Sequence, residues 1–415
     1  MKTPIKIAIY SGVLPATTFI ENLITEVGKQ HKVYLFGTIK VPTSYTSKNI
    51  HIVETSTNQW QNIPQTILRV CQLLIKRPKR VWIAYKEAKR YKTPYEQWMR
   101  FSRFIPVLLY QPDVFHLQWA SKIDRWMFLK QAYNCKIILS LLGSNINIDP
   151  ITKPILKDWY LKHFPNIDAF HAVSHHLAKA AIGFGANPEK LKVIRTTILE
   201  ETFNYFKPKT KLNETIELLS VGRHHQVKGY KHAILAIKTL KNQGVKVKYT
   251  IIAQGLVPEE LLLLVQQQEL QGQVFFKDGL PQEKLFTAMQ NYDALVLPSL
   301  SEGIANVVLE AMLLGVPVIS TNCGGMPEVV IPKETGWLVP VANPEALSNG
   351  IIDFIYTDKD EIEQITNNAF QLVNTQFDTQ TVVKQYIELY ESVCHSEGCM
   401  KASTAFLRAQ SEAND

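Results

Sequence analysis

The fold is decided by the stretch "DALVLPSLSEGIANVVLEAMLLGVPVIS", residues 293–320. An apolar run ends at Pro298-Ser299, a polar loop follows, and an apolar helical pattern then leads to a second β-rich run. Strand, helix and strand in this order are typical of a right-handed crossover in a parallel sheet. In such a sheet, ligands bind at the carboxyl ends of the strands, so the loop at 299–303 is a candidate site.

The same alternation extends in both directions from this stretch. Runs rich in Val, Ile and Phe predict buried strands in "IKIAIY", "KVYLFG", "VFHLQW", "KIILSLLG", "AFHAVS", "IELLSVG", "KYTIIAQG", "QVFFKDG", "DALVLPS" and "PVISTN". We therefore predict an α/β fold of two Rossmann-like doubly wound domains facing across a cleft, over residues 1–205 and 215–375. A polar, lysine-rich linker is expected at 206–214. A C-terminal helix over 376–395 is a candidate to pack back on the first domain, and 396–415 reads as a tail.

Composition and charge narrow the class of protein. Hydrophobic residues make up 46% and charged residues 20% of the 415 residues, as in folded proteins. The beginning reads as a first buried strand rather than as a signal peptide. Five scattered cysteines without metal-ligand spacing favour a reducing cytoplasm. Residues 1–205 carry 28 Lys+Arg against 13 Asp+Glu (28 − 13 = +15), and the rest 17 against 24 (17 − 24 = −7). The basic half is expected to face an anionic partner.

Two carboxylates frame the helical pattern of the opening stretch, Glu302 and Glu310. One helix through both would place them about 12 Å apart along its axis and within about 80° around it. The N–H groups of Gly303 and Ile304 at the helix start suit a phosphate. Carboxylates accept hydrogen bonds from sugar hydroxyls. The spacing predicts a ligand with a phosphate at its centre and hydroxyls on both sides.

Two further segments support this site. "LLSVGRHHQVKGYKHAI" places Gly222 and Arg223 at a strand end and Lys228 before another helix. Arg223, a planar fork, and Lys228, a point charge, can converge on a diphosphate. "TNCGGMPEVV" carries Gly324-Gly325, which permits a tight turn near a ligand.

Together these segments resemble glycosyltransferase family 4, the retaining enzymes with the GT-B fold, also called glycosyl transferases group 1. The likeness is strong over 215–345 and loose over 1–205. It implies that a nucleoside-diphosphate sugar is the co-substrate and that neither a further cofactor nor a metal is needed. The residues implied in catalysis and in donor binding are Gly222, Arg223, Lys228, Lys277, Glu302, Gly303, Ile304 and Glu310.

The roles that the resemblance implies differ among these residues. Arg223 and Lys228 would neutralise the diphosphate, and Glu302 would lie beside the transferred sugar. Glu310 would hold the ribose hydroxyls, and Lys277 would border the base.

The sequence departs from the family pattern in both halves. "IIAQG" has Ala253 where the family often has glycine, and "LSLLGSNI" has Leu142 where it usually has histidine. A sugar-nucleotide-binding protein without turnover, and a GT-B sugar-nucleotide epimerase, therefore stay open as alternatives. On the acceptor side the resemblance implies Ser11, Gly12 and Thr18. His116 is a further acceptor-side candidate, and a purely structural role is the alternative for this residue.

The stretch Ile75–Phe104 holds ten Lys+Arg against two Glu, interleaved with aromatic residues. This composition fits a segment that binds an anionic membrane surface, a segment that binds a nucleic acid, or a solvated helix without a partner. The resemblance favours the membrane, because the family's acceptor is often a lipid-linked sugar. We thus expect a hexosyltransferase acting on a lipid-linked or surface-polysaccharide precursor. It would be cytoplasmic and peripheral to the inner face of the membrane, with no nucleic-acid partner.

Overall fold

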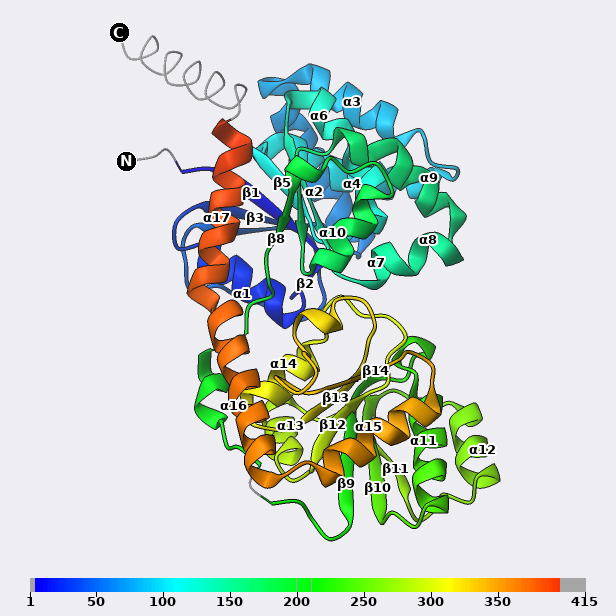
Figure 1. Cartoon of the computed structure of the whole chain (residues 1–415). Coiled ribbons are helices and arrows are strands. Elements are labelled where there is room, and N and C mark those ends of the chain that lie inside the picture. The colour runs from blue at the N-terminus through cyan, green and yellow to red at the C-terminus, as the bar shows by residue number, and fades with distance from the viewer. Residues whose placement is uncertain (1–3, 199, 210, 396–415) are drawn as a thin grey trace. The chain divides into compact units, whose positions relative to one another are not determined.

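The computed structural model describes residues 4–198, 200–209 and 211–395. These divide into two compact units (Figure 1). Of the described residues, unit 1 contains 4–173, Ala178–Thr197 and 380–395, and unit 2 contains Ser174–Leu177 and the described part of Ile198–Thr379. The main border thus falls earlier than the expected one at 205. The predicted tail at 396–415 lies outside the described residues.

Unit 1 is built on a parallel sheet in the order β2-β3-β1-β5-β6-β7-β8, with β4 paired to β3. Its strands are β1 (Lys6–Tyr10), β2 (Gly12–Leu14), β3 (Lys32–Ile39), β4 (Ile50–Glu54), β5 (Val114–Leu117), β6 (Lys136–Leu141), β7 (Ala169–Ala172) and β8 (Leu191–Val193). The five strands predicted here are confirmed. The strands β2, β4 and β8 were not predicted, because they are short or carry polar residues that a buried-strand pattern excludes.

Helices flank this sheet. Between residues 18 and 182 they are α1 (Thr18–Val27), α2 (Gln59–Lys76), α3 (Pro78–Ala88), α4 (Pro94–Tyr110), α5 (Ile123–Trp126), α6 (Phe128–Tyr133), α7 (Ser144–Asn147), α8 (Asp149–Thr152), α9 (Pro154–His163) and α10 (His175–Ile182). The helix α17 (Thr379–His395) joins α1 in a core with β1 and β3. In the part of the chain with described coordinates, no helix has both the length and the apolarity needed to cross a membrane.

A polar network lies inside the core of unit 1. His116 on β5 has its Nδ1 2.8 Å from the hydroxyl of Tyr390 and its Nε2 2.8 Å from Ser140 Oγ. Ser140 Oγ is also 2.9 Å from Nδ1 of His171, whose Nε2 donates to the carbonyl oxygen of Ile194 at 2.9 Å. Burial lowers the pKa of His171 to about 4, and burial together with neighbouring His171 lowers the pKa of His116. Both imidazoles are therefore neutral in the folded protein.

This network predicts that unit 1 loses stability in mild acid. An unfolded histidine titrates near 6.5. As the pH falls from about 6.5 toward 4, the unfolded chain takes up protons that folded His116 and His171 refuse. The free energy of unfolding should fall by up to about 1.4 kcal/mol per pH unit for each histidine. Hydrogen exchange of the β5 and β6 amides measures this, and His171→Gln should reduce the slope. Equal protection at pH 7 and pH 5 would contradict the prediction.

Unit 2 has a second parallel sheet, in the order β11-β10-β9-β12-β13-β14. Its strands are β9 (Ile216–Arg223), β10 (Val247–Gln254), β11 (Val274–Asp278), β12 (Ala294–Leu297), β13 (Val318–Thr321) and β14 (Trp337–Val339). Five of them were predicted. Its helices are α11 (Tyr230–Asn242), α12 (Glu259–Gln267), α13 (Gln282–Met289), α14 (Asn306–Leu313), α15 (Pro344–Tyr356) and α16 (Lys359–Gln376).

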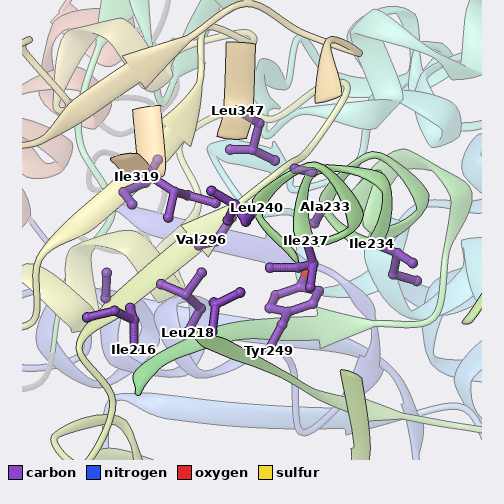
Figure 2. Packing of buried hydrophobic residues seen from close by; sticks show 14 of the residues in the cluster. Ile216, Leu218, Ala233, Ile234, Ile237, Leu240, Tyr249, Val296, Ile319 and Leu347 are labelled. Atoms are coloured by element: carbon purple, nitrogen blue, oxygen red, sulfur yellow. The ribbon is translucent and has the colours of Figure 1, made fainter. Parts of the chain in front are cut away.

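Each face of the second sheet has its own core. On one face Leu218 and Tyr249 pack against Ile237 of α11, with α12 and α15 completing the layer (Figure 2). On the other face Leu219 and neighbouring strand residues pack against α13, α14 and α16. Successive strand residues point to opposite faces, so a strand covered on both sides is apolar throughout. This explains the continuous apolar runs in the sequence.

The expected linker at 206–214 lies on unit 2. The backbone N–H groups of Lys207 and Lys209 donate to the carbonyl oxygens of Leu314 and Gly315, at 3.3 and 3.2 Å. Gly315 has φ +74°, and a Cβ there would lie 2.5 Å from the Lys207 oxygen. Only glycine allows this approach. The segment is therefore bound to unit 2 and is not a flexible linker.

Candidate active site

Except for Lys277 and Glu310, the predicted site residues of unit 2 lie at or after the ends of β9 and β12. Lys228 follows β9 in the short helix η5 (Gln226–Lys228), and its Nζ lies 2.8 Å from Oε1 of Glu302. Ser299 Oγ donates to the same carboxylate oxygen, also at 2.8 Å. The side chains of Lys228 and Glu302 are only 16% and 15% exposed. Lys228 and Glu302 thus form a hydrogen-bonded ion pair beyond the carboxyl ends of the strands, where it is partly shielded from water.

The loop after β9 is pressed against the loop after β12. The N–H of Leu300 donates to the carbonyl of Val227 at 2.7 Å. Gly229 has φ +65°, and a Cβ at this residue would lie 2.0 Å from the Pro298 oxygen. Glycine is required by both the backbone conformation and the contact. This contact fixes Lys228 beside Glu302.

The Gly324-Gly325 turn after β13 closes the other side of the site. The N–H of Gly325 donates to the carbonyl of Gly303 at 2.9 Å. A Cβ at Gly324 would lie 1.8 Å from the oxygen of Glu302, and one at Gly325 would lie 2.1 Å from that of Gly303. The two glycines therefore let one backbone segment pack directly on another. The predicted tight turn near the site is confirmed as a backbone contact.

The structure corrects the expected helix start. The helix α14 begins at Asn306, with Ala305 in an extended conformation before it. Glu302, Gly303 and Ile304 therefore lie in the loop, and the single helix through both glutamates does not form. Within the described part of the chain, the N–H groups of Gly303 and Ile304 have no hydrogen-bond partner. They remain donors for a ligand, although from a loop.

Glu310 lies in the second turn of α14. Gln282, the first residue of α13, donates from Nε2 to Glu310 Oε1 at 3.2 Å. Burial raises the pKa of Glu310 to about 6, and the hydrogen bond from Gln282 opposes this. Among the described residues the amide of Gln282 is the one hydrogen-bond partner of this carboxylate, which keeps further acceptor positions that vicinal hydroxyls can occupy.

Arg223 and Lys277 take no part in the ion pair between Lys228 and Glu302. Arg223 ends β9, is exposed, and has no ion pair among the described residues. Lys277 Nζ lies 3.4 Å from the hydroxyl of Tyr292, which precedes β12. Lys277 and Tyr292 help to line a groove of about 690 Å³ together with Glu217 near the start of β9. Neither Lys228 nor Glu302 lines this groove, and the place of Lys277 beside the donor base stays a prediction.

Sequence reasoning missed three polar residues of this site: Ser299, Gln282 and Tyr230. A Cβ at Gly222 would lie 2.8 Å from the hydroxyl of Tyr230, which is buried and without a hydrogen-bond partner in the described chain. Burial, and secondarily the charge of Glu302, raise the pKa of Tyr230. Its position directly after "KG" at a helix start was the available signal.

The acceptor-side candidates lie in unit 1. Ser11 and Gly12 directly follow β1, and exposed Thr18 begins α1. Gly12 has φ +87°, and Ser11 Oγ donates to the carbonyl of Val13 at 2.7 Å. His116 is different, because it is fully buried and both its ring nitrogens have partners inside the core. We therefore assign His116 to the core rather than to the acceptor side.

Comparisons with known proteins agree with this arrangement. Residues 202–372 match the family model described as glycosyl transferases group 1. A Salmonella typhimurium protein, provisionally named colanic acid biosynthesis glycosyltransferase WcaL, is 29% identical over 255 residues. The match covers 59% of this chain and 63% of that protein, so less than two thirds of the relative is spanned. The amylovoran biosynthesis glycosyltransferase AmsK of Erwinia amylovora is 28% identical over 67% of this chain and 70% of its own length.

Solved structures match along both units. Anabaena HepE in complex with UDP and glucose has a TM-score of 0.67 and 18% identity, covering 94% of this chain and all of that one (100%). Sucrose-phosphate synthase of Thermosynechococcus elongatus has a TM-score of 0.70 and 19% identity, covering 94% and 99%. At such identities the likeness shows the fold alone. The predicted GT-B fold class is confirmed.

Proposed function

We propose that this chain transfers a sugar from a nucleoside-diphosphate sugar to a hydroxyl acceptor, because residues 202–372 match the family model of the glycosyl transferases of group 1. The acceptor class that we propose is a surface-polysaccharide precursor carried on a lipid. The observation that carries the proposal is the Lys228–Glu302 pair, held at the carboxyl edge of the sheet with Ser299. The solved complex of HepE with UDP and glucose, and the names of WcaL and AmsK, support this choice.

The proposed reaction retains the configuration at the anomeric carbon. The bond from that carbon to the diphosphate oxygen breaks, and a bond to the acceptor oxygen forms on the same face. The acceptor's proton passes to the departing phosphate. Lys228 and Arg223 stabilise the negative charge that grows on this phosphate, and the N–H groups of Gly303 and Ile304 add to it. Glu302 stabilises the positive charge that grows on the sugar.

Tyr230 has a place in this scheme. Its unpartnered hydroxyl lies beside Gly222, and it can donate to a phosphate oxygen that Lys228 approaches from the same loop. Two cations, two backbone donors and a hydroxyl carry the charge of the leaving group. We therefore propose that transfer proceeds without a metal ion, and expect activity to persist in EDTA.

Incubation with UDP-, GDP- and ADP-sugars and a lipid extract, followed by mass spectrometry, tests the function. A product heavier than the acceptor by one sugar supports it. An altered sugar nucleotide without any acceptor would identify the epimerase instead. Nucleotide binding with no product in any mixture would favour the binding protein that Leu142 keeps open.

We further propose that helices α2 to α4 lie against an anionic membrane. Their surface exposes Trp60, Ile75, Trp82 and Tyr95 by 89, 85, 57 and 63%. Lys86 lies over the ring of Trp82, with its Nζ 5.5 Å from the centroid. Exposed aromatic and aliphatic side chains among cations suit the boundary between headgroups and acyl chains.

Replacing Lys76, Arg77 and Lys79 by serine should release the protein from vesicles rich in phosphatidylglycerol, since each cation near the surface contributes about 1 kcal/mol. All three are exposed, whereas Arg80 packs over Tyr133 and is left unchanged. The matched control replaces three exposed lysines of unit 2, Lys211, Lys333 and Lys359. Equal co-sedimentation of both triple variants would contradict the membrane proposal. If the parent protein then bound single-stranded nucleic acid, the partner of this surface would be a nucleic acid instead.

A further inference from the structure

Unit 1 contains a second concentration of charge that the donor site does not use. Arg100 and Arg103 stand three residues apart on α4, and Lys122 and Arg125 stand three apart on η1 (Ala120–Lys122) and α5. Residues three apart on a helix share a face. Charge interactions join Arg100 to Arg103 and Arg125, and join Lys122 to all three arginines. All four side chains are half-buried. We refer to these four residues as the cationic cluster.

The cluster lies at the point where the strand order of the sheet changes direction. β1 has β3 on one side and β5 on the other, so the chain proceeds outward both ways from this pair. Lys122 and Arg125 follow β5 on η1 and α5, and Tyr10 is the last residue of β1. The rings of Tyr10 and Trp126 are 4.9 Å apart. In doubly wound sheets, ligands bind outside the carboxyl ends of the strands at this point.

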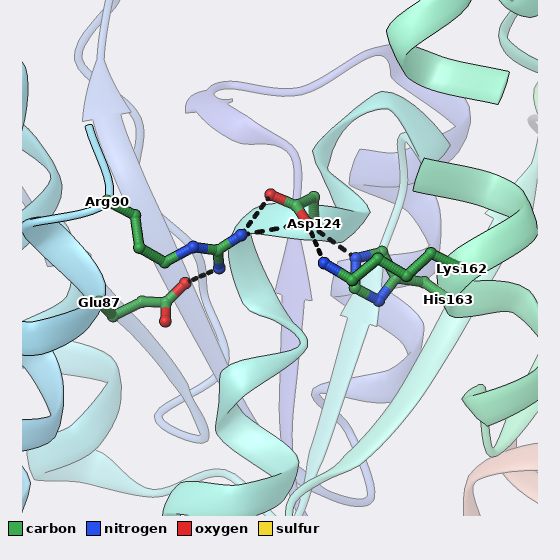
Figure 3. A network of polar contacts seen from close by, with 5 residues as sticks. All are labelled: Glu87, Arg90, Asp124, Lys162 and His163. Atoms are coloured by element: carbon green, nitrogen blue, oxygen red, sulfur yellow. Dashed lines mark hydrogen bonds and ion pairs between the residues drawn. The ribbon is translucent and has the colours of Figure 1, made fainter. Parts of the chain in front are cut away.

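The nearby carboxylate is already engaged elsewhere. Asp124 precedes Arg125, yet its oxygens lie 3.1 Å from Arg90, 3.6 Å from Lys162 and 2.8 Å from His163 (Figure 3). The hydrogen bond from His163 is the main cause that lowers the pKa of Asp124 to about 2. Arg90 is further bound by Glu87. Asp124 and Glu87 are therefore bound to cations outside the cluster.

Within the described residues, no carboxylate lies within 4.0 Å of any member of the cationic cluster. The Nε atoms of Arg100 and Arg125 are buried and have no hydrogen-bond partner there. Burial, and then Arg125, Arg100 and Arg103, lower the pKa of Lys122. A buried donor without a partner destabilises the folded protein, and more so when it is charged. The guanidinium of Arg100 lies over the ring of Tyr91, 4.9 Å from its centroid, which compensates one of the four charges in part. Like charges held together without a carboxylate are expected where an anionic ligand balances them.

We propose that Arg100, Arg103, Lys122 and Arg125 form a binding site in unit 1 for the diphosphate group of the acceptor. The inference rests on the proposed sugar transfer only in treating the anion as part of the acceptor. Guanidinium groups match the oxygens of phosphates in pairs. Four cations balance the two or three charges of a diphosphate, whereas one carboxylate would leave most of them uncompensated. Ser11 and Gly12, the acceptor-side candidates, follow β1 at the same edge of the sheet.

The test measures binding of inorganic pyrophosphate by calorimetry, with no donor present. The background is the full chain carrying Arg223→Ala and Lys228→Ala, so that the proposed donor site does not contribute. Adding Arg103→Gln and Lys122→Gln should weaken pyrophosphate binding at least tenfold. The charge-preserving pair Arg103→Lys and Lys122→Arg should retain most of it. The matched control replaces Lys157 and Lys179, two exposed lysines of unit 1, by glutamine and should bind like its parent.

The melting temperature of the same variants distinguishes a ligand site from a cluster that has only a structural role. Removing two like charges relieves repulsion, so the Arg103→Gln, Lys122→Gln variant should have an equal or higher Tm without ligand. It should also lose the rise in Tm that pyrophosphate gives its parent. A lower Tm together with unchanged pyrophosphate binding would overturn the proposal.

Vesicles distinguish a lipid-borne diphosphate from a free one. Phosphatidylcholine vesicles with and without a few per cent of a polyprenyl diphosphate are sedimented with each variant. Loss of the diphosphate-dependent fraction in Arg103→Gln, Lys122→Gln assigns the site to the lipid carrier. Loss of pyrophosphate binding alone assigns it to a soluble diphosphate. No loss in either arm overturns the site, whether or not sugar transfer is found, because neither arm depends on turnover.

Discussion

Replacing Lys228 by alanine should lower kcat/KM for sugar transfer by about a hundredfold, since one preorganised cation at a departing oxygen contributes on that scale. The side chain is held 2.8 Å from Glu302 and is only 16% exposed, so its charge acts in a partly dehydrated site. Arg223→Ala, at an exposed position without an ion pair in the described chain, should cost about tenfold. Steady-state kinetics with the donor identified by mass spectrometry measures both.

Unit 2 offers a matched control for this prediction. Lys246 Nζ and Glu214 Oε1 are also 2.8 Å apart, but their side chains are 68 and 87% exposed. Lys246→Ala breaks an ion pair of equal length away from the site and should leave kcat/KM unchanged. If Lys246→Ala and Lys228→Ala were equally active, Lys228 would be an ordinary surface lysine and the donor site would be wrongly placed.

Replacing Glu310 by glutamine should raise the KM for the donor about tenfold and change kcat little. Ribose hydroxyls are held alike before and during reaction, and losing such a contact weakens binding alone. In the parent protein the donor KM should rise as the pH falls through about 6, because burial raises the pKa of Glu310 to about 6. The glutamine variant should lack this dependence. A parent KM that is constant from pH 7.5 to 5 would remove Glu310 from the site.

The free energy of unfolding should depend on pH through Glu310 in the direction opposite to donor binding. The folded pKa lies above the unfolded value of about 4.5, so the folded state binds more protons between pH 4.5 and 6. Stability contributed by the protonated form is therefore lost as the pH rises through about 6. Glu310→Gln should be more stable than the parent above pH 6, by at most about 2 kcal/mol, and equal to it below pH 4.5. Denaturation of both proteins at pH 4.5 and 7.5 measures the difference.

Glu302→Gln should behave differently from Glu310→Gln. It should lower kcat with little change in donor affinity, because positive charge grows on the sugar only as its bond to phosphate breaks. Calorimetric titration with the nucleoside diphosphate separates binding from turnover. Normal binding and normal turnover in both glutamine variants would show that the two glutamates do not form a site.

The sequence predicts the central strands well because they are buried on both faces. β5, β6, β12 and β13 are largely apolar, with few polar residues among Val, Ile, Leu and Phe, and each was found. β4, with the sequence IHIVE, mixes polar and apolar residues at the side of the sheet, and β14 has three residues. Neither gives the pattern of a strand covered on both faces. Their pairing depends on neighbours that lie far away in the sequence.

The site was predictable in residue types but not in geometry. Glycines, cations and glutamates at strand ends indicate a phosphate site, yet the start of α14 was placed too early. Ile304 and Ala305 are apolar and would suit a helix, but the N–H of Gly325 donates to the Gly303 carbonyl and holds the loop extended. The Lys228–Glu302 pair spans 74 residues. Such contacts depend on the tertiary fold, which local periodicity does not encode.

The return of α17 to unit 1 has a consequence for synthesis on the ribosome. Val382, Tyr386, Leu389 and Tyr390 of this helix belong to the same core as β1 and β3. The nascent chain therefore exposes the surface that α17 later covers while all of unit 2 is still being translated. Unit 1 is the first to emerge and the last to be completed. A ribosome stalled before residue 380 should carry an incomplete unit 1 that chaperones bind, beside a unit 2 able to fold from its own residues.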